Sequence, residues 1–459
     1  MESFWDFSVW GTVSVLAVLM VGILIGNILK KSIPLLRVSL IPTSVLGGLI
    51  LLVVASLYKV FTGNVFFESA VFGGNGTKTL EILTYHCLAL GFIAATLKAT
   101  DGRFTKKRSI EIFNTGITTV STYLIQAILG MGITMIAAKV MSNFFSAAGV
   151  LLAFGFGQGT GQALNFGNIY QMDFGFEYGR HFGLTIAALG FLSAALGGVI
   201  HLNIIRKRGY IRPGNENDKI LKEHQIEGKN EIPMQESIDK LTIQLALIGA
   251  TYIVAFIFMY TLGSLFPGMK SVIFGFNFLI GVLTAVLCKA ILNMLKKTGM
   301  AKKQYTNNFL LTRVSNMFFD IMVIAGIAAI RLDLLEKYWG VLLILAGVGI
   351  VSTYVYNRYV ANTLFPEYKE EQFMVMYGML TGTASTGIIL LREIDKEFKT
   401  PAAENLVYQQ IPAIVFGFPM MFLALLAPVR PIFTWLILIM FFIAMNIILF
   451  RSKIFGRRR

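Results

Sequence analysis

Long apolar segments separated by short polar ones dominate the chain. A helix needs about 20 apolar residues to cross the hydrocarbon core of a bilayer. Eleven segments come close to this length or exceed it, and each predicts a transmembrane helix: residues 8–29, 39–58, 82–97, 110–138, 181–205, 241–266, 272–295, 309–330, 338–356, 406–427 and 432–449. The pattern therefore predicts an all-α integral membrane protein with about 11 transmembrane helices.

Two further apolar segments, residues 147–167 and 373–391, are too rich in glycine and threonine to be ordinary membrane spans. Glycine lets the backbone turn tightly and approach a ligand closely. Non-helical backbone at membrane depth survives only where protein buries it or water reaches it. We therefore expect each segment to be a re-entrant or broken helix that lines a polar site.

The composition excludes several classes of protein. The chain of 459 residues is 55% hydrophobic and 14% charged, whereas an ordinary soluble domain is about 25% charged. This argues against a soluble enzyme and a disordered chain, and two cysteines make no disulfide framework. The net charge is +15, but the basic residues lie between apolar runs rather than over one water-soluble face, so we expect no nucleic-acid partner.

The basic residues instead predict an orientation. With the N-terminus outside and neither Gly/Thr-rich segment crossing the membrane, 30 of the 40 Lys and Arg residues fall in cytoplasmic loops and eight fall outside. This is a strong positive-inside bias. A full crossing by either segment would invert the loops after it and remove the bias. We therefore expect the first segment to enter from outside and the second from inside, with the C-terminus in the cytoplasm.

A shift of 223 residues aligns the two Gly/Thr-rich segments and brings most flanking spans into the same order. A shift of 234 aligns residues 93–95 with 327–329. Each copy has five spans, an odd number, so the second copy is upside down, as in secondary transporters. The expected organisation is a first inverted repeat (1–204), a cytoplasmic linker (205–240), a second inverted repeat (241–427), and an extra transmembrane helix with a basic tail (428–459).

The two segments carry neutral donors and acceptors that suit a small anion and a sodium ion. Helix starts at breaks offer N–H groups to a carboxylate, although close packing by small residues would use the same pattern. Asp320 lies in the middle of a span, where charge is costly and usually functional; a structural pair with Arg313 is the alternative. Arg392 fits an anion or a solvated helix end equally well. The candidate substrate-binding residues are Gln158, Gly159, Thr160, Gln162, Asn165, Thr381, Thr383, Ser385, Thr386 and Arg392, and the candidate sodium ligands are Thr160, Thr383, Ser385 and Asp320.

Three motifs resemble those of the bacterial sodium/glutamate symporter family. They are Ile41-Pro42-Thr43-Ser44-Val45-Leu46-Gly47-Gly48, Gly157-Gln158-Gly159-Thr160-Gly161 and Thr381-Gly382-Thr383-Ala384-Ser385-Thr386-Gly387. The resemblance covers residues 8–427 and implies a sodium-coupled glutamate carrier in the bacterial inner membrane. It also implies a homodimer and Gly/Thr-rich segments that line the substrate and sodium sites. Gln158 stands where family members often have His, and Leu390-Leu391-Arg392-Glu393 is less polar than a glutamate carrier suggests.

We therefore expect a secondary active transporter that couples sodium to glutamate or a related amino acid or carboxylate. We expect no enzyme and no cofactor beyond the coupling ion, because the sequence has no nucleotide-binding, metalloprotease or serine-hydrolase motif. The alternatives are a proton-coupled carboxylate transporter that uses Asp320, or an anion channel, which would need a continuous polar pore. A membrane-embedded enzyme would need several ionisable residues that converge at membrane depth, and Asp320 is the clear one in the sequence.

Overall fold

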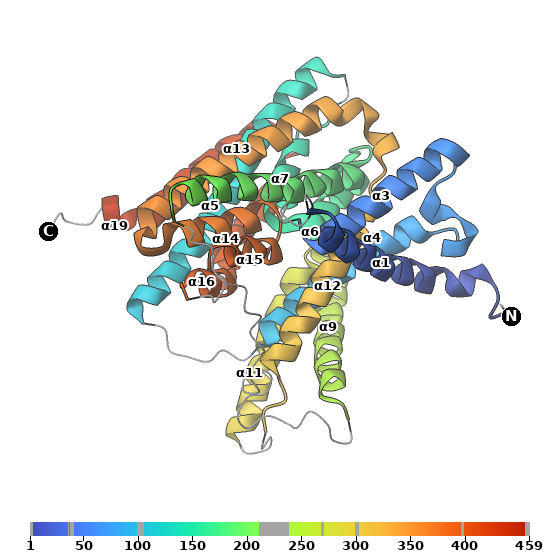
Figure 1. Ribbon diagram of the computed structural model, residues 1–459, viewed down its shortest axis with the longest axis horizontal. Coiled ribbons are helices and arrows are strands. Elements are labelled where there is room, and N and C mark those ends of the chain that lie inside the picture. The colour runs from blue at the N-terminus through green and yellow to red at the C-terminus, as the bar shows by residue number, and fades with distance from the viewer. Residues whose placement is uncertain are drawn as a thin grey trace. The chain divides into compact units, whose positions relative to one another are not determined.

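The computed structural model describes residues 3–34, 36, 41–98, 105–142, 144–210, 238–267, 270–298, 303–395 and 399–454. Within these ranges the chain is helical and no β-strand occurs (Figure 1). The basic tail, Arg457 to Arg459, and most of the expected linker lie outside the described residues. The principal helices are α1 (Phe7–Ser32), α3 (Thr43–Thr62), α4 (Gly76–Leu97), α5 (Lys106–Val140), α6 (Leu151–Phe174), α7 (Gly179–Lys207), α9 (Lys240–Leu265), α10 (Lys270–Gly275), α11 (Asn277–Lys297), α12 (Asn308–Ala328), α13 (Trp339–Leu364), α14 (Lys369–Thr381), α15 (Ala384–Arg392), α16 (Ala402–Tyr408), α17 (Gln410–Leu426), α18 (Pro431–Leu449) and α19 (Arg451–Ile454).

Ten of the described helices are long and apolar enough to cross a membrane, and the bent pair of α16 and α17 brings the number to 11. The prediction of an all-α, multi-pass membrane protein is thus confirmed. The helices that replace the expected span at 406–427 meet at a bend of 50°. Pro412 follows this bend, and proline has no N–H to donate to the preceding turn. Neither α6 nor the pair of α14 and α15 is among the candidate spans.

The chain forms two compact units, and neither unit is one continuous segment of the sequence. The first comprises residues 1–81, 104–212 and 323–459, and the second comprises residues 82–103 and 213–322. Helices α4 and α12 each contribute residues to both units. These compact units are defined by contacts, whereas the expected repeats are defined by similarity between two parts of the sequence. The boundaries of the expected repeats and linker therefore stay predictions.

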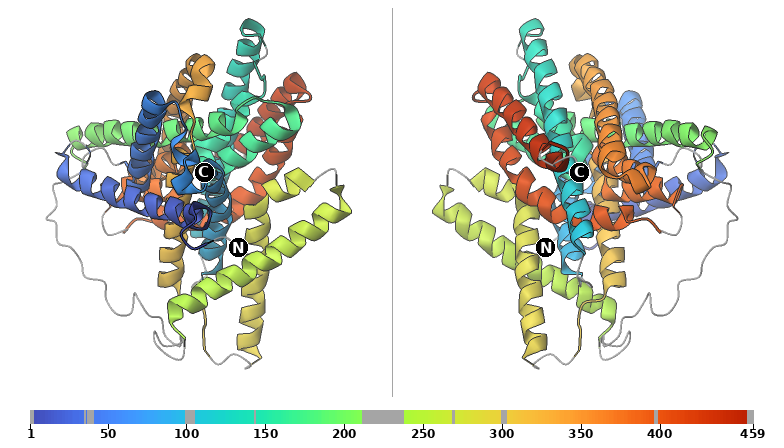
Figure 2. Two further views of the ribbon diagram at one scale, coloured as in Figure 1. Left: turned by 90° about the vertical axis from the view of Figure 1, so that its right-hand side faces the viewer. Right: turned by 90° about the vertical axis from the view of Figure 1, so that its left-hand side faces the viewer.

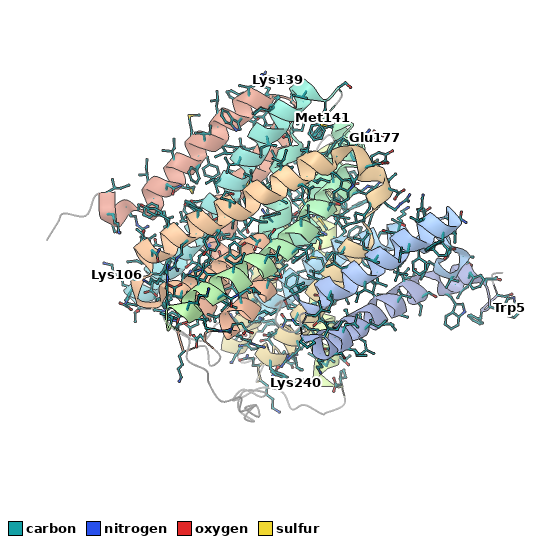
Figure 3. The ribbon with its side chains drawn as sticks, turned by 45° about the horizontal axis from the view of Figure 1, so that its top comes forward. Trp5, Lys106, Lys139, Met141, Glu177 and Lys240 are labelled. Carbon is teal, nitrogen blue, oxygen red and sulfur yellow. The ribbon has the colours of Figure 1, made fainter. Side chains whose placement is uncertain are left out.

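The first unit is organised around α5, which has 35 residues and is therefore about 52 Å long. Lys106 and Lys139 mark its two ends (Figure 3). This exceeds the roughly 30 Å hydrocarbon core of a bilayer, so the helix is long enough to span the core at a tilt. Helices α13 and α18 pack side by side with α5 (Figure 2). In the same unit α1 packs on α3 through small residues, since a Cβ at Gly47 would lie 2.7 Å from the carbonyl oxygen of Gly22.

The second unit packs α9, α11, the later part of α4 and the earlier part of α12 around a small apolar core. Its buried members include Ile93, Ile248, Ala285 and Leu311. The Phe319 ring covers Gly91, where a Cβ would lie 2.7 Å from the ring. The hydroxyl of Ser315 donates to the carbonyl of Gly91 over 2.9 Å.

Candidate functional site

Helix α6 is interrupted at Gly159, inside the first Gly/Thr-rich segment. Gly159 has φ 78° and ψ −170° within an otherwise helical run. A positive φ with this ψ is open almost only to glycine. The sequence therefore places one of the five glycines of α6 where the helix breaks.

The two arms of α6 fold back on each other at this break. Phe154 and Phe166 lie on opposite sides of Gly159, and their rings stack with centroids 3.8 Å apart. In a continuous helix this separation of twelve positions would correspond to a rise of about 18 Å. The stacked pair therefore fixes a hairpin of two short helices, with Gly159 at its tip. We call this segment the first hairpin.

Helices α14 and α15 form a second hairpin with its tip at residues 382–383. Gly382 leaves the helical conformation with φ −146° and ψ −106°. The two helices touch closely, since a Cβ at Gly378 would lie 2.7 Å from the Cα of Gly387. Thr383 begins the returning helix and its hydroxyl accepts from the N–H of Thr386 over 3.5 Å. This is an N-cap, which satisfies one of the free N–H groups at a helix start.

The two hairpin tips meet inside the first unit. A Cβ added at Gly159 would lie 3.3 Å from Cγ2 of Thr383 and 3.6 Å from the carbonyl oxygen of Gly382. The buried ring of Phe191, on α7, lies against both tips: its Cζ would be 3.9 Å from that Cβ, and its Cδ1 would be 3.1 Å from a Cβ at Gly382. The break in each helix therefore faces the break in the other.

The structure brings most of the candidate substrate-binding residues to these tips or just behind them. Thr160 packs against α12, where a Cβ at Gly326 would lie 2.7 Å from Thr160 Cβ. Gln162 accepts a hydrogen bond from Asn165 over 3.1 Å, and its buried Nε2 has no partner among the described residues. Gln158 and Thr383 are half-buried. The fully or almost fully buried candidates are Thr160, Gln162, Asn165, Thr381 and Thr386.

Two predicted residues do not join this group, and the side chain of a third is not described. Arg392 is exposed at the end of α15 opposite the tip. Asp320 is half-buried on the part of α12 that belongs to the second unit. Ser385 is the second residue of α15, but its side chain lies outside the described part of the structure. Their assigned roles stay predictions.

A polar cluster that the sequence did not reveal lies between α5 and α13, directly behind the tips. The Gln126 amide donates to the Thr353 hydroxyl over 2.8 Å and to the carbonyl of Leu380 over 2.9 Å. The Asn357 amide donates to the Thr122 hydroxyl over 3.3 Å and to the carbonyl of Thr353 over 2.9 Å. The available signal was a threonine and an amide residue one helical turn apart in each of two apolar spans. We call Thr122, Gln126, Thr353 and Asn357 the amide–threonine cluster.

A charged cluster holds the base of the second hairpin. Arg358 donates to both carboxylate oxygens of Glu370 over 2.6 and 2.7 Å. His201, on α7, bonds Glu370 through Nε2 over 2.9 Å and Tyr354 through Nδ1 over 2.8 Å. Burial disfavours the ionised form of Glu370, but the hydrogen bonds from His201 and Arg358 outweigh it and lower the pKa of this carboxyl to about 2.

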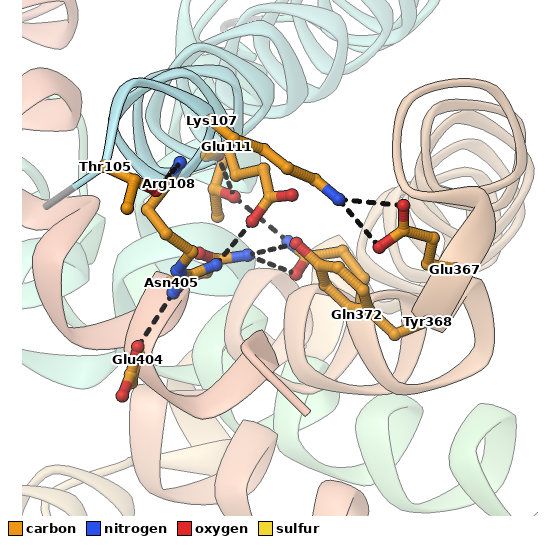
Figure 4. A network of polar contacts seen from close by, with 10 residues as sticks. Thr105, Lys107, Arg108, Glu111, Glu367, Tyr368, Gln372, Glu404 and Asn405 are labelled. Carbon is orange, nitrogen blue, oxygen red and sulfur yellow. Dashed lines mark hydrogen bonds and ion pairs between the residues drawn. The ribbon is translucent and has the colours of Figure 1, made fainter. Parts of the chain in front are cut away.

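A second network ties the start of α5 to the segments around the second hairpin (Figure 4). Lys107 bonds Glu367 over 2.8 Å, and Arg108 bonds Glu404 over 2.9 Å. Deeper in, Asn405 donates to Gln372 over 3.1 Å. Because exposed ion pairs contribute little to stability, the buried amides fix this end of the hairpin more firmly than the surface lysine does.

A comparison of the chain with protein-family models and with curated protein sequences found no match.

Proposed function

We propose that the protein is a secondary active transporter that carries glutamate or a related amino acid or carboxylate together with sodium by alternating access. The observation that carries the proposal is the contact between Gly159 and Thr383 at the tips of two interrupted helices. Interrupted helices that meet at membrane depth are the form of binding site common in such transporters, because their free backbone groups replace the water around a solute.

The chemistry of the tips supports an anionic solute. Thr160 and Thr383 each begin a returning helical arm, where N–H groups and the helix dipole favour negative charge. The Nε2 of Gln162, which has no hydrogen-bond partner in the described part of the chain, adds a buried donor two residues beyond Thr160. Sodium would be held by neutral oxygens, including the hydroxyls of Thr160 and Thr383 and that of Ser385.

Two mirrored sets of contacts support the inverted repeat that alternating access requires. The shift that carries Thr122 to Thr353 also carries Gln126 to Asn357, so the two amide-to-threonine hydrogen bonds of the cluster are equivalents of each other. Such reciprocal contacts arise where a two-fold axis relates two segments.

The second set involves α3, α4, α11 and α12. Gly48 packs against Ile327 in the first unit, and Gly281 packs against Ile93 in the second. The shift that carries Ile93 to Ile327 carries Gly48 to within one residue of Gly281. In the proposed orientation the N-terminus is outside, the C-terminus is in the cytoplasm, and the two hairpins enter the membrane from opposite sides.

Uptake of labelled glutamate into proteoliposomes with an imposed sodium gradient tests the proposal. We expect uptake that ends when the gradient is dissipated. No uptake of any carboxylate or amino acid would exclude the transporter. Uptake that depends on a pH gradient and not on sodium would indicate coupling to protons, with Asp320 as the candidate proton carrier. Flux without accumulation against a gradient would indicate an anion channel.

A further inference from the structure

The amide–threonine cluster contains two buried oxygen atoms without a donor. They are Oε1 of Gln126 and Oδ1 of Asn357, and neither has a hydrogen-bond partner among the described residues. Gln126 is 0% exposed and Asn357 is 2% exposed. Buried polar atoms are almost always paired, so two such acceptors in one cluster require an explanation.

The hydrogen bonds of the cluster show that these atoms are oxygens and not exchanged nitrogens. Asn357 Nδ2 faces the main-chain carbonyl of Thr353, and Gln126 Nε2 faces that of Leu380. A carbonyl can only accept, so the group that faces it must be the NH₂ of each amide. Exchanging the two ends of either amide would place oxygen against oxygen.

The neighbouring hydroxyl of Thr122 does not supply the missing donor for Asn357. It donates its one hydrogen to the carbonyl of Thr118 over 2.8 Å, while it accepts from Asn357. An acceptor that no protein donor reaches can be satisfied by water or by a cation. The ligands here are neutral amide oxygens, and no group of three or more His, Cys, Asp or Glu residues suited to a metal occurs among the described residues. Divalent hard cations are ordinarily bound with the help of carboxylates.

We propose that Gln126 Oε1 and Asn357 Oδ1 are ligands of a second sodium ion, bound between α5 and α13 behind the hairpin tips. The inference rests on the proposed function. It adds a second sodium site that is separate from the candidate ligands at the hairpin tips. Gln126 lies near the middle of α5, and Asn357 lies in the last third of α13, seven residues before its end.

The site would act on the second hairpin through Gln126. A cation on Oε1 draws electron density from the amide and strengthens the hydrogen bond that its nitrogen donates to Leu380. Leu380 lies one residue before Thr381 and the break that follows. Sodium would therefore order the tip before solute binds, and by linkage the bound solute would tighten sodium by the same factor.

The test is the sodium-dependent rise in the unfolding midpoint of the full-length protein in detergent, without solute. Sodium chloride is titrated against choline chloride at constant ionic strength, because a ligand that binds only the folded state raises its stability. We expect a saturable rise for the wild type. For Gln126→Leu and for Asn357→Leu we expect the half-saturating sodium concentration to rise about tenfold or more, which corresponds to about 1.4 kcal/mol per lost ligand.

Gln409→Leu is the matched control. Gln409 is equally buried, but its oxygen accepts from Thr119 and its nitrogen bonds the Met379 sulfur. This variant should keep the wild-type sodium response. Unchanged responses in the two test variants would overturn the second site and leave the proposed transporter standing. If sodium does not raise the unfolding midpoint of the wild type, sodium coupling is removed from the proposed function as well.

A second variant covers the case in which the leucine variants fail to fold. Gln126→Glu keeps the size of the side chain but turns a carboxylate toward the Leu380 carbonyl, and a bound sodium ion would relieve this repulsion. We expect lower stability than wild type in choline and a larger rise with sodium. A rise no larger than that of the wild type would contradict the site.

Discussion

Gly159 and Thr383 face each other across the contact between two helical hairpins that come from opposite halves of the chain. A methyl group on Gly159 would lie 3.3 Å from the Thr383 methyl carbon. The backbone at Gly159 has a positive φ that other residues rarely adopt. Gly159 thus lies at a helix break, forms the tip of one hairpin and contacts the tip of the other. The proposed transport site surrounds this residue.

The threonines that begin the returning arms give the first prediction. Thr160→Val and Thr383→Val keep the shape of the side chain but remove its hydroxyl, which at Thr383 caps α15. We expect sodium-driven uptake to fall at least several-fold, while the loss of the cap costs about 1 kcal/mol of stability. Uptake is measured in proteoliposomes with equal amounts of inserted protein.

Thr434→Val is the control for these variants. Thr434 is as fully buried as Thr160, but its hydroxyl has no partner among the described residues. It should transport like the wild type. Normal uptake by both tip variants would show that the tip hydroxyls do not take part in binding.

The opposite entry of the two hairpins gives the second prediction. Cys87 and Cys288 are first replaced by alanine, and a single cysteine is then placed at the exposed Asp173, at the end of α6, or at the exposed Glu367. An impermeant thiol reagent should label the Asp173→Cys variant only from outside and the Glu367→Cys variant only from inside. Labelling of both from one side would reject the proposed topology.

Glu370 gives a prediction about pH. Its carboxyl has a pKa of about 2 in the folded protein, against an ordinary value of 4.5. A depressed pKa means that ionised Glu370 stabilises the fold above pH 4.5, and that this contribution is lost as the pH falls toward 2. At pH 7, Glu370→Gln should therefore be less stable by about 3–5 kcal/mol, since it leaves buried partners of a charge unmatched.

The measurement is the unfolding midpoint of wild type and Glu370→Gln between pH 7 and pH 3. The difference between them should shrink below pH 4.5. Glu367→Gln is the control, because Glu367 forms an exposed ion pair with Lys107, and its stability should differ little from wild type at any pH. A difference for Glu370→Gln that stays constant down to pH 3 would contradict the assigned charge state.

The sequence predicted the membrane spans and the two unusual segments because both depend on local composition. Apolar length decides the spans, and a run such as Gly157 to Gly161 cannot form an ordinary helix surface. The contact between the tips, by contrast, joins residues from different halves of the chain. Composition contains no information about which break faces which.

The amide–threonine cluster was missed for the same reason. Gln126 looks like an isolated polar residue in an apolar span until Thr353 and Leu380 are brought to it by folding. The compact units also escaped prediction, because α4 and α12 each contribute to both and no composition change marks the point where they divide. Arg392 is the last of the nine residues of α15, at the end away from the tip, and its role stays a prediction.

A comparison of Gly159→Ala with Gly347→Ala tests whether the transport site lies at the hairpin tips. A Cβ at Gly159 would strain the backbone and press on Thr383, whereas at Gly347, on α13, it would meet nothing within 4 Å. The measurement is the initial rate of labelled glutamate uptake into proteoliposomes under an imposed sodium gradient. We predict rapid uptake by the wild type and by Gly347→Ala, and a loss of at least about tenfold in Gly159→Ala. Equal rates in all three proteins would contradict a transport site at the meeting point of the two hairpins.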